Sequence, residues 1–111
     1  MDNKISTWLY DILNSIEEIE GYFEGRSMDF FEYQKDTKTK RAVERNIEII
    51  GEAVNRILKE EPGISIENAR NIVGTRNRII HSYDSIADDM IWSIVIKSLP
   101  VLKVEIKNLL K

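Results

Sequence analysis

The sequence predicts an all-α protein, an up-and-down bundle of four long helices plus one short helix. Apolar residues recur at spacings of three and four along the chain, which is the periodicity of helices that bury one face. The chain has only five glycines and two prolines, too few for the many turns of a sheet of short strands. Its 111 residues correspond to one domain, residues 1–111, with a single core.

Composition narrows the class of protein. Hydrophobic residues make up 42% of the chain and charged residues 32%, with both signs interspersed, which favours a soluble globular domain over a disordered chain. The net charge of −3 argues against a protein that coats nucleic acid by bulk electrostatics, although a local basic patch can still contact phosphates. The absence of cysteine excludes disulfides and thiolate metal sites. No basic leader with an apolar run opens the chain, and no apolar stretch approaches the roughly 18 residues of a membrane span, so we expect a cytoplasmic protein with no membrane partner.

The first long helix is expected at about residues 3–24. Gly25 supplies its stop, and Ser27 is the expected N-cap of a short helix over residues 28–35. Phe30 and Phe31 are expected to hold that short helix against the bundle. The apolar stripe of the first helix consists of Trp8, Leu9, Ile12, Ile16, Ile19 and Phe23.

The next helix, at about residues 37–60, carries a near-heptad apolar seam, which is a strong helical signal. Gly51 lies in the middle of that seam. A glycine inside a helix costs roughly 1 kcal/mol relative to alanine, so a close approach of another helix is the expected reason for it. The seam residues are Val43, Ile47, Ile50, Val54 and Leu58, and the helix opens with the basic residues Lys38, Lys40, Arg41 and Arg45.

The chain breaks at Pro62 and Gly63, and Ser65 can cap a fourth helix over about residues 66–83. Gly74 interrupts that helix and again suggests tight packing. Ser85 and Asp88 form a capping box for the last helix, at about residues 86–110. Pro100 is expected to kink this last helix because proline removes a backbone hydrogen bond.

Residues 76–84, with the sequence RNRIIHSYD, concentrate chemically useful side chains. His81 is the only histidine of the chain, and at about 100° per residue it points roughly 140° away from Arg76 on a helix. A long guanidinium can still curl toward the imidazole. Asn77 lies one turn before His81, and Tyr83 returns to the face of Arg76. These four residues can surround one small site, with Arg78 and Ser82 farther around the helix.

The residue types in this stretch suit phosphodiester cleavage without a metal. Histidine, with an unperturbed pKa of about 6.5, can both accept and donate a proton at neutral pH. Arginine offers two parallel N–H groups to a phosphate and stabilises the charge that develops on it. One histidine per chain cannot be both general base and general acid, whereas a homodimer that joins two copies of this helix supplies two.

The RNRIIHSYD segment resembles the R-x4-H motif of the HEPN superfamily, and the tyrosine extends it to the R-x4-H-x-Y form of the HepT toxins. Residues 41–57, RAVERNIEIIGEAVNRI, also resemble the third helix of that family, and residues 92–102, WSIVIKSLPVL, resemble its last helix. The resemblance implies a single HEPN/HepT-like domain and a toxin of a type II toxin–antitoxin system. It further implies a homodimer with a composite active site and a cognate antitoxin, a minimal nucleotidyltransferase of the MntA type.

The resemblance also implies roles for individual residues. HEPN toxins are metal-independent endoribonucleases, so Arg76 would hold the scissile phosphate of the RNA substrate and His81 would transfer protons, with no cofactor. Attack by the ribose 2′-OH would leave a 2′,3′-cyclic phosphate. Asn77 would orient the histidine or the RNA. Tyr83 matches the tyrosine that the nucleotidyltransferase modifies with AMP, and the added bulk and negative charge would silence an anion-binding site.

Several features of the sequence have an alternative interpretation. The basic residues Lys38, Arg41 and Arg45, with Arg78, are candidate RNA contacts, but a basic helix end is equally often only solvated. Asp84, Asp88 and Asp89 are better explained by compensation of the helix dipole than by a magnesium site. The competing function is a HEPN module that no longer cuts RNA and serves as a binding partner of a nucleotidyltransferase. The aromatic residues expected in the core, and not in a base-stacking surface, are Trp8, Phe23, Phe30, Phe31 and Trp92.

Overall fold

A computed structural model describes residues 3–81 and 87–111. The first half of the chain forms α1 (Asn3–Tyr22), the short α2 (Phe30–Lys35) and α3 (Thr37–Glu60). The second half forms α4 (Ala69–His81) and then a continuous run of helix made of α5 (Asp88–Ser93), η2 (Ile94–Ser98) and α6 (Leu99–Leu109). The predicted all-α bundle of four long helices plus a short one is confirmed.

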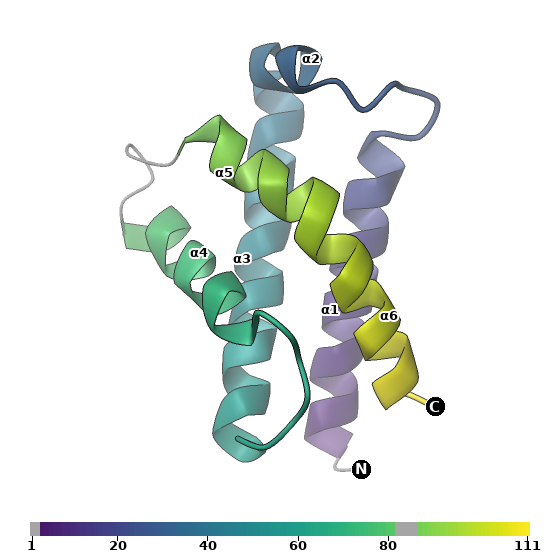
Figure 1. Ribbon diagram of the computed structural model, residues 1–111, viewed down its shortest axis with the longest axis vertical. Coiled ribbons are helices and arrows are strands. Elements are labelled where there is room, and N and C mark those ends of the chain that lie inside the picture. The colour runs from purple at the N-terminus through teal and green to yellow at the C-terminus, as the bar shows by residue number, and fades with distance from the viewer. Residues whose placement is uncertain (1–2, 82–86) are drawn as a thin grey trace.

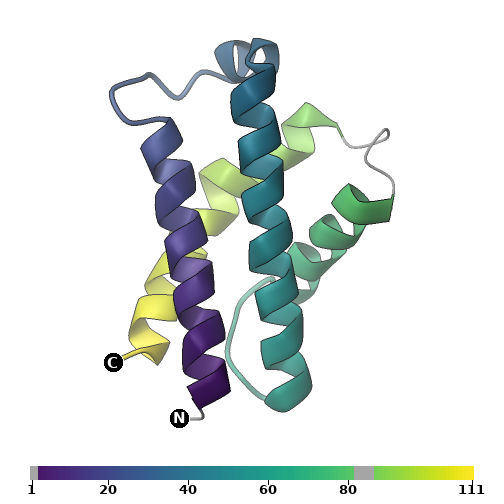
Figure 2. The same ribbon diagram turned by 180° about the vertical axis from the view of Figure 1, so that it is seen from behind.

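The helices form two layers. The long helices α1 and α3 run antiparallel in one layer, and α4 and the α5–η2–α6 run cross them in the other (Figure 1). The view from behind shows α1 and α3 side by side in front of the crossing helices (Figure 2). The α3 helix packs against both α1 and α4. Within the described part of the chain, no helix is long and apolar enough to cross a membrane.

The core lies between the layers and consists mainly of aliphatic side chains. An aromatic group extends it to the end of the bundle at α2, where the rings of Tyr33 and Trp92 lie 4.9 Å apart and those of Phe23 and Trp92 lie 5.7 Å apart. Most apolar residues predicted from the helical stripes are buried. Fully buried members of the core include Leu9, Ile12, Val43, Ile47, Ile50, Val54, Ile57, Ile91, Leu102 and Ile106.

The prediction that Phe31 holds the short helix is wrong, because its side chain is 69% exposed. Phe30 packs against the core, and Tyr33, three residues later on the same face of α2, is buried. The N-cap of α2 is Asp29 and not Ser27, since the Asp29 carboxylate accepts hydrogen bonds from the backbone N–H groups of Phe31 and Glu32. Gly25 has the positive φ of 75° that lets the chain turn after α1.

The start of α4 also differs from the prediction. Asn68 has a φ of 59°, a conformation that asparagine tolerates and that a helix does not contain. The helix therefore begins at Ala69, so Ser65 does not cap it. Before this turn, the backbone N–H of Glu67 donates a 2.8 Å hydrogen bond to the carboxylate of Glu105, which attaches the loop to α6.

The last helical run begins at Asp88, and Ala87 in the N-cap position provides no side-chain hydrogen bond. Ser85, the other residue of the predicted capping box, lies outside the described residues. Asp88 instead accepts a 2.9 Å hydrogen bond from Nζ of Lys40, which joins α5 to α3.

The last helical run contains a wide turn, η2, directly before Pro100. The N–H of Leu99 bonds to the carbonyl of Ile94, five residues back, as in a π-helix. Proline cannot continue the ordinary α-helical ladder because its ring clashes with the carbonyl four residues earlier. A π turn therefore lies directly before Pro100, in the helix where the sequence predicts a kink.

Candidate active site

The α4 helix carries most of the predicted site residues and is held against α3 by one face. Its buried positions are Ala69, Ile72, Thr75 and Ile79. Because successive residues on a helix point about 100° apart, the three polar residues after Thr75 fan outward. Arg76, Asn77 and Arg78 each line a different hollow on the surface.

Gly51 determines how closely α4 approaches α3. A Cβ atom built on Gly51 would collide with Cβ of Arg76, and it would lie 2.8 Å from Cγ of Arg76 and 3.3 Å from the carbonyl oxygen of Ile72. The stem of Arg76 therefore lies directly on the backbone of α3. This confirms the prediction that Gly51 permits a close helix approach. The matching prediction for Gly74 is wrong, because nothing lies within 4 Å of a Cβ built there.

The guanidinium of Arg76 has two partners. Nη1 donates a 2.7 Å hydrogen bond to Oδ1 of Asn77, and Nη2 forms an ion pair with Oε2 of Glu52 on α3. This ion pair lacks hydrogen-bond geometry, and Nε of Arg76 is buried without a hydrogen-bond partner in the described part of the chain. With 23% of its side chain exposed, Arg76 is fixed between the two helices and still reaches the surface.

Glu52 connects Arg76 to a second arginine. Its Oε1 accepts a 3.0 Å hydrogen bond from Nε of Arg56, one turn farther along α3. One carboxylate thus lies between two guanidinium groups, and the three side chains carry a net charge of about +1 at neutral pH.

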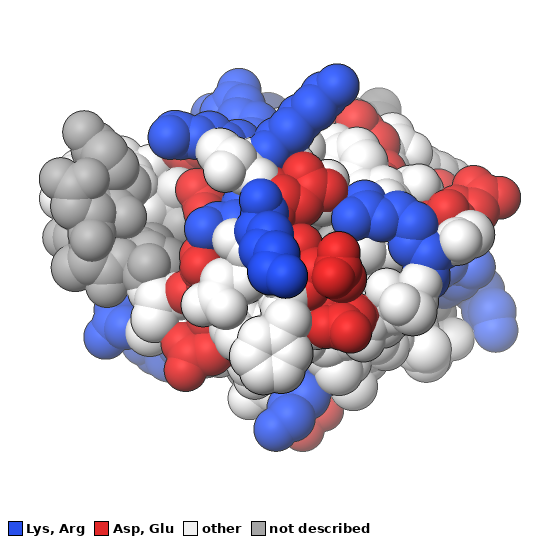
Figure 3. All heavy atoms as spheres, turned by 90° about the horizontal axis from the view of Figure 1, so that it is seen from above, with Lys and Arg blue, Asp and Glu red and all other residues white. Residues whose placement is uncertain are grey.

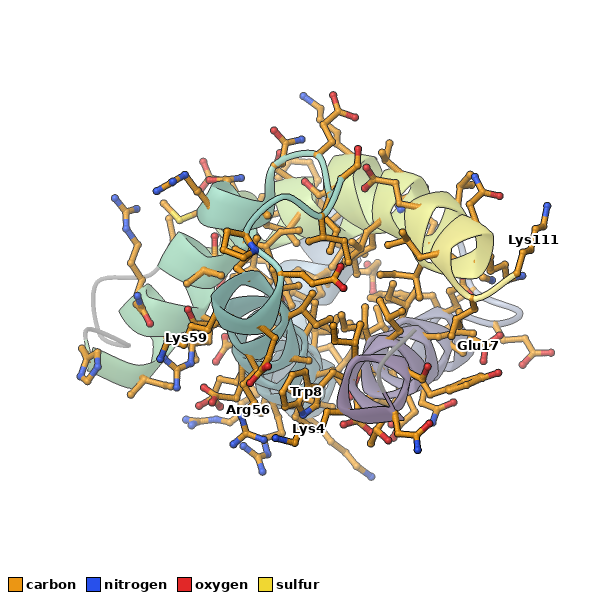
Figure 4. All side chains as sticks on the ribbon, turned by 90° about the horizontal axis from the view of Figure 1, so that it is seen from below. Lys4, Trp8, Glu17, Arg56, Lys59 and Lys111 are labelled. Atoms are coloured by element: carbon orange, nitrogen blue, oxygen red, sulfur yellow. The ribbon has the colours of Figure 1, made fainter. Side chains whose placement is uncertain are left out.

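Arg76 lines a hollow of about 310 Å³ between α1, α3 and α4, which we call the α1–α3–α4 hollow. Trp8 from α1 and Arg56 from α3 project toward the same side of the molecule (Figure 4). Trp8, expected in the core, is only partly buried and forms part of this wall. The charged residues of the lining are Asp11, Arg45, Glu48, Glu52, Arg56 and Arg76. Their three positive and three negative charges make the hollow a mixed surface and not a purely basic one.

His81 is the last residue of α4 and is exposed. Its side chain has no hydrogen bond or ion pair within residues 3–81 and 87–111 and does not line the α1–α3–α4 hollow. The structure thus joins Arg76 to Asn77 directly, whereas His81 lies at the exposed end of the same helix, outside the hollow that Arg76 lines. Tyr83, the predicted modification site, lies outside the described residues.

The other predicted RNA contacts are spread over two helices. Arg45 lines the α1–α3–α4 hollow and lies 3.9 Å from a carboxylate oxygen of Glu48. Lys38 and Arg41 are exposed nearer the start of α3. Arg78 lines a separate groove, where Nη1 lies 3.3 Å from the sulfur of Met90. Lys and Arg are interspersed with Asp and Glu on the end of the molecule seen from above (Figure 3).

Glu52 and Arg56 were not among the residues that the sequence indicated. The Glu52–Arg56 pair has the helical spacing of four that favours an ion pair, and this signal was available. The contact of Glu52 with Arg76 joins two helices and has no local signature. Among the described residues, no group of three or more His, Asp or Glu side chains is placed to hold a metal ion.

Comparison with known proteins gives a consistent result. The family model described as Ribonuclease HepT-like matches residues 12–109. The chain is 33% identical over 111 residues to "Putative RNase MJ0127" of Methanocaldococcus jannaschii, covering 96% of this chain and 88% of that protein. It is 33% identical over 105 residues to "Probable ribonuclease HepT" of Thermococcus cleftensis, covering 94% of each. No solved structure gives a significant match.

Proposed function

Because the chain belongs to the HepT-like ribonuclease family of the HEPN superfamily, we propose that it is an endoribonuclease whose reacting groups are Arg76 and His81. The observation that carries this proposal is the arrangement on α4. The Arg76 guanidinium is held at the surface by Glu52 and Asn77, and the same helix ends at an exposed His81.

The proposed reaction needs no metal. The imidazole of one His81 accepts the proton of a ribose 2′-OH, and O2′ attacks the adjacent phosphorus. The bond from phosphorus to the 5′-oxygen breaks, and that oxygen receives a proton from a second, protonated imidazole. The products are a 2′,3′-cyclic phosphate and a 5′-OH. Arg76 stabilises the negative charge that builds on the phosphate oxygens.

The second imidazole must come from another copy of the chain, which has one histidine. We therefore propose a homodimer in which the α4 helices of two protomers face a shared cleft. The exposed position of His81 at the end of α4 supports this arrangement. Asn77 would keep Arg76 oriented within the cleft, and Arg45, Arg41, Lys38 and Arg78 would contact RNA phosphates on either side.

The decisive experiment is cleavage of RNA by the purified protein in the presence of EDTA. Wild type is expected to cut RNA and His81→Ala to lose activity by at least about 100-fold, because proton transfer contributes about 10²–10⁴-fold to such reactions. Since His81 is exposed, the variant should keep its helical content by circular dichroism. Equal cleavage by both proteins would remove His81 from the mechanism. An inactive wild type that still binds a nucleotidyltransferase would favour a binding module.

We further propose that the protein is the toxin of a type II toxin–antitoxin pair and that its antitoxin is an MntA-type nucleotidyltransferase. The nucleotidyltransferase would transfer AMP from ATP to the Tyr83 hydroxyl, forming a phosphodiester and releasing pyrophosphate. Tyr83 lies two residues after His81, so the added phosphate would place negative charge beside an anion-binding site.

Co-expression with the nucleotidyltransferase tests this modification. The wild-type chain should gain mass in whole AMP units by mass spectrometry and lose its cleavage of RNA. Tyr83→Phe should gain no mass and keep its activity, since phenylalanine has no hydroxyl to modify. A modified Tyr83→Phe protein would place the modification on another residue.

A further inference from the structure

Glu52 lies between Arg56 and Arg76, and it has no part in the bond-making and proton-transfer steps of the proposed reaction. Its Oε1 bonds to Arg56 within α3, and its Oε2 faces Nη2 of Arg76 on α4. The Arg56 side chain is 55% exposed, whereas that of Arg76 is 23% exposed. Charge pairs interact more strongly where water is excluded. The ion pair of Glu52 with Arg76, which joins α3 to α4, is therefore the stronger of the two pairs.

Three contacts together restrict Arg76. The backbone at Gly51 lies against its stem, Asn77 accepts a hydrogen bond from Nη1, and Glu52 pairs with Nη2. Without the carboxylate, the end of this long side chain could adopt several rotamers. The carboxylate faces Nη2 and so restricts the orientation of the guanidinium, while N–H groups remain uncommitted on both Nη atoms.

We propose that Glu52 is a positioning residue that orients Arg76 before RNA binds. The proposal rests on the function proposed above, in which Arg76 holds the scissile phosphate. Orientation in advance lowers the barrier because the arginine does not have to be ordered in the transition state. The same carboxylate repels the RNA backbone, so Glu52 weakens RNA binding while it accelerates cleavage. These opposite effects distinguish positioning from a general electrostatic or structural role.

The first test compares Glu52→Gln with Glu48→Gln in the full-length protein. Glu48 lies one turn earlier on α3, lines the same α1–α3–α4 hollow and contacts Arg45 instead of Arg76. Glu52→Gln should lower kcat by about 10- to 100-fold, as expected for a misplaced reacting group, and should bind RNA more tightly than wild type. Glu48→Gln should keep kcat within about twofold of wild type. Glu52→Asp, which keeps the charge on a shorter side chain, should have an intermediate kcat.

A double-mutant cycle tests the contact without reference to activity. The change in unfolding midpoint of the double variant Glu52→Gln/Arg76→Gln should differ from the sum of the changes in the two single variants. The changes caused by Glu48→Gln and Arg76→Gln should simply add. Circular dichroism verifies that each variant is helical, and the Glu52→Asp protein substitutes in both assays if Glu52→Gln does not fold.

The outcomes separate the two proposals. If the wild type cleaves RNA, either of two results would overturn the positioning role alone. One is an unchanged kcat in the Glu52 variants, and the other is additive changes in unfolding midpoint for Glu52→Gln and Arg76→Gln. A lower kcat in Glu52→Gln together with RNA binding that is unchanged or weaker would also overturn it. A wild type that does not cleave RNA would overturn the proposed function and this inference with it.

Discussion

Gly51 is the residue on which the position of Arg76 depends. Any side chain at this position would occupy the space of the Arg76 stem, and the nearest colliding atom is Cβ of Arg76, which cannot move without moving the α4 backbone. Gly74 on α4 has the opposite environment, because a Cβ there would meet nothing within 4 Å. The two glycines look alike in sequence, each within a helix, and differ only in what lies beside them.

Substitution of these two glycines by alanine should therefore have opposite effects. Gly51→Ala is expected to lower the free energy of unfolding by up to about 2 kcal/mol, since an overpacking cost of about 1–3 kcal/mol is only partly offset by a gain of about 1 kcal/mol in helix propensity. Gly74→Ala, the matched control, should raise it by up to about 1 kcal/mol. Urea unfolding followed by circular dichroism measures both. Equal stabilisation of the two variants would contradict the close approach at Gly51.

Among the helices, α3 does most to organise the molecule, since it packs against α1 on one side and α4 on another. Its first turn is held by Asp36, which also ends α2. The Asp36 carboxylate accepts hydrogen bonds from the backbone N–H of Thr39 at 3.1 Å and from its hydroxyl at 2.6 Å. These bonds to Thr39, and then the nearby Arg26, lower the pKa of Asp36 below its usual value.

Asp36→Ala should lower the thermal unfolding midpoint at neutral pH, because the first turn of α3 loses its cap. A lowered pKa in the folded state means that the ionised carboxylate stabilises the fold above the unfolded pKa of about 3.9, and that this stabilisation is lost as the pH falls through the folded pKa. The difference between wild type and variant should therefore shrink below about pH 4. A difference that stays constant through the acid range would show that the carboxylate charge is not involved.

At the scale of the whole molecule, the two layers make a thin slab with principal extents of 41 × 31 × 18 Å. The layers leave α4 at one side of the slab (Figure 1). Arg76 and His81 leave this helix in different directions, Arg76 into the α1–α3–α4 hollow and His81 into solvent. The described part of one chain therefore does not enclose a reacting phosphate between Arg76 and His81, which is a further reason to propose a dimer.

Mixing of two inactive variants tests the composite site. If both protomers contribute to one cleft, a heterodimer of Arg76→Ala and His81→Ala contains one Arg76 and one His81. It keeps a phosphate contact and one of the two proton-transfer groups, so it should cleave RNA faster than either parent variant and more slowly than wild type. Co-refolding the two variants allows subunits to exchange, and size-exclusion chromatography with light scattering verifies the dimer. A mixture as inactive as its components, although the subunits have exchanged, would contradict a shared cleft.

The sequence by itself determined the all-α class, the approximate helices, most of the core and the placement of Arg76, Asn77 and His81 on one helix. These properties follow from local periodicity, which repeats every 3.6 residues and is visible in any window of the chain. It also indicated that Gly51 permits a close approach, because a glycine in an apolar seam is costly without one. The sequence did not identify which side chain packs against Gly51.

Only the tertiary structure decided the partners of the site. The pairing of Glu52 with Arg76, the hollow that includes Trp8, and the outward direction of Phe31 all depend on how one helix is rotated and shifted against its neighbour. The beginning of α4 depends likewise on the left-handed conformation of Asn68. Periodicity specifies which face of a helix is buried, but the register between two helices is set by packing of their side chains, and this information is distributed over the whole core.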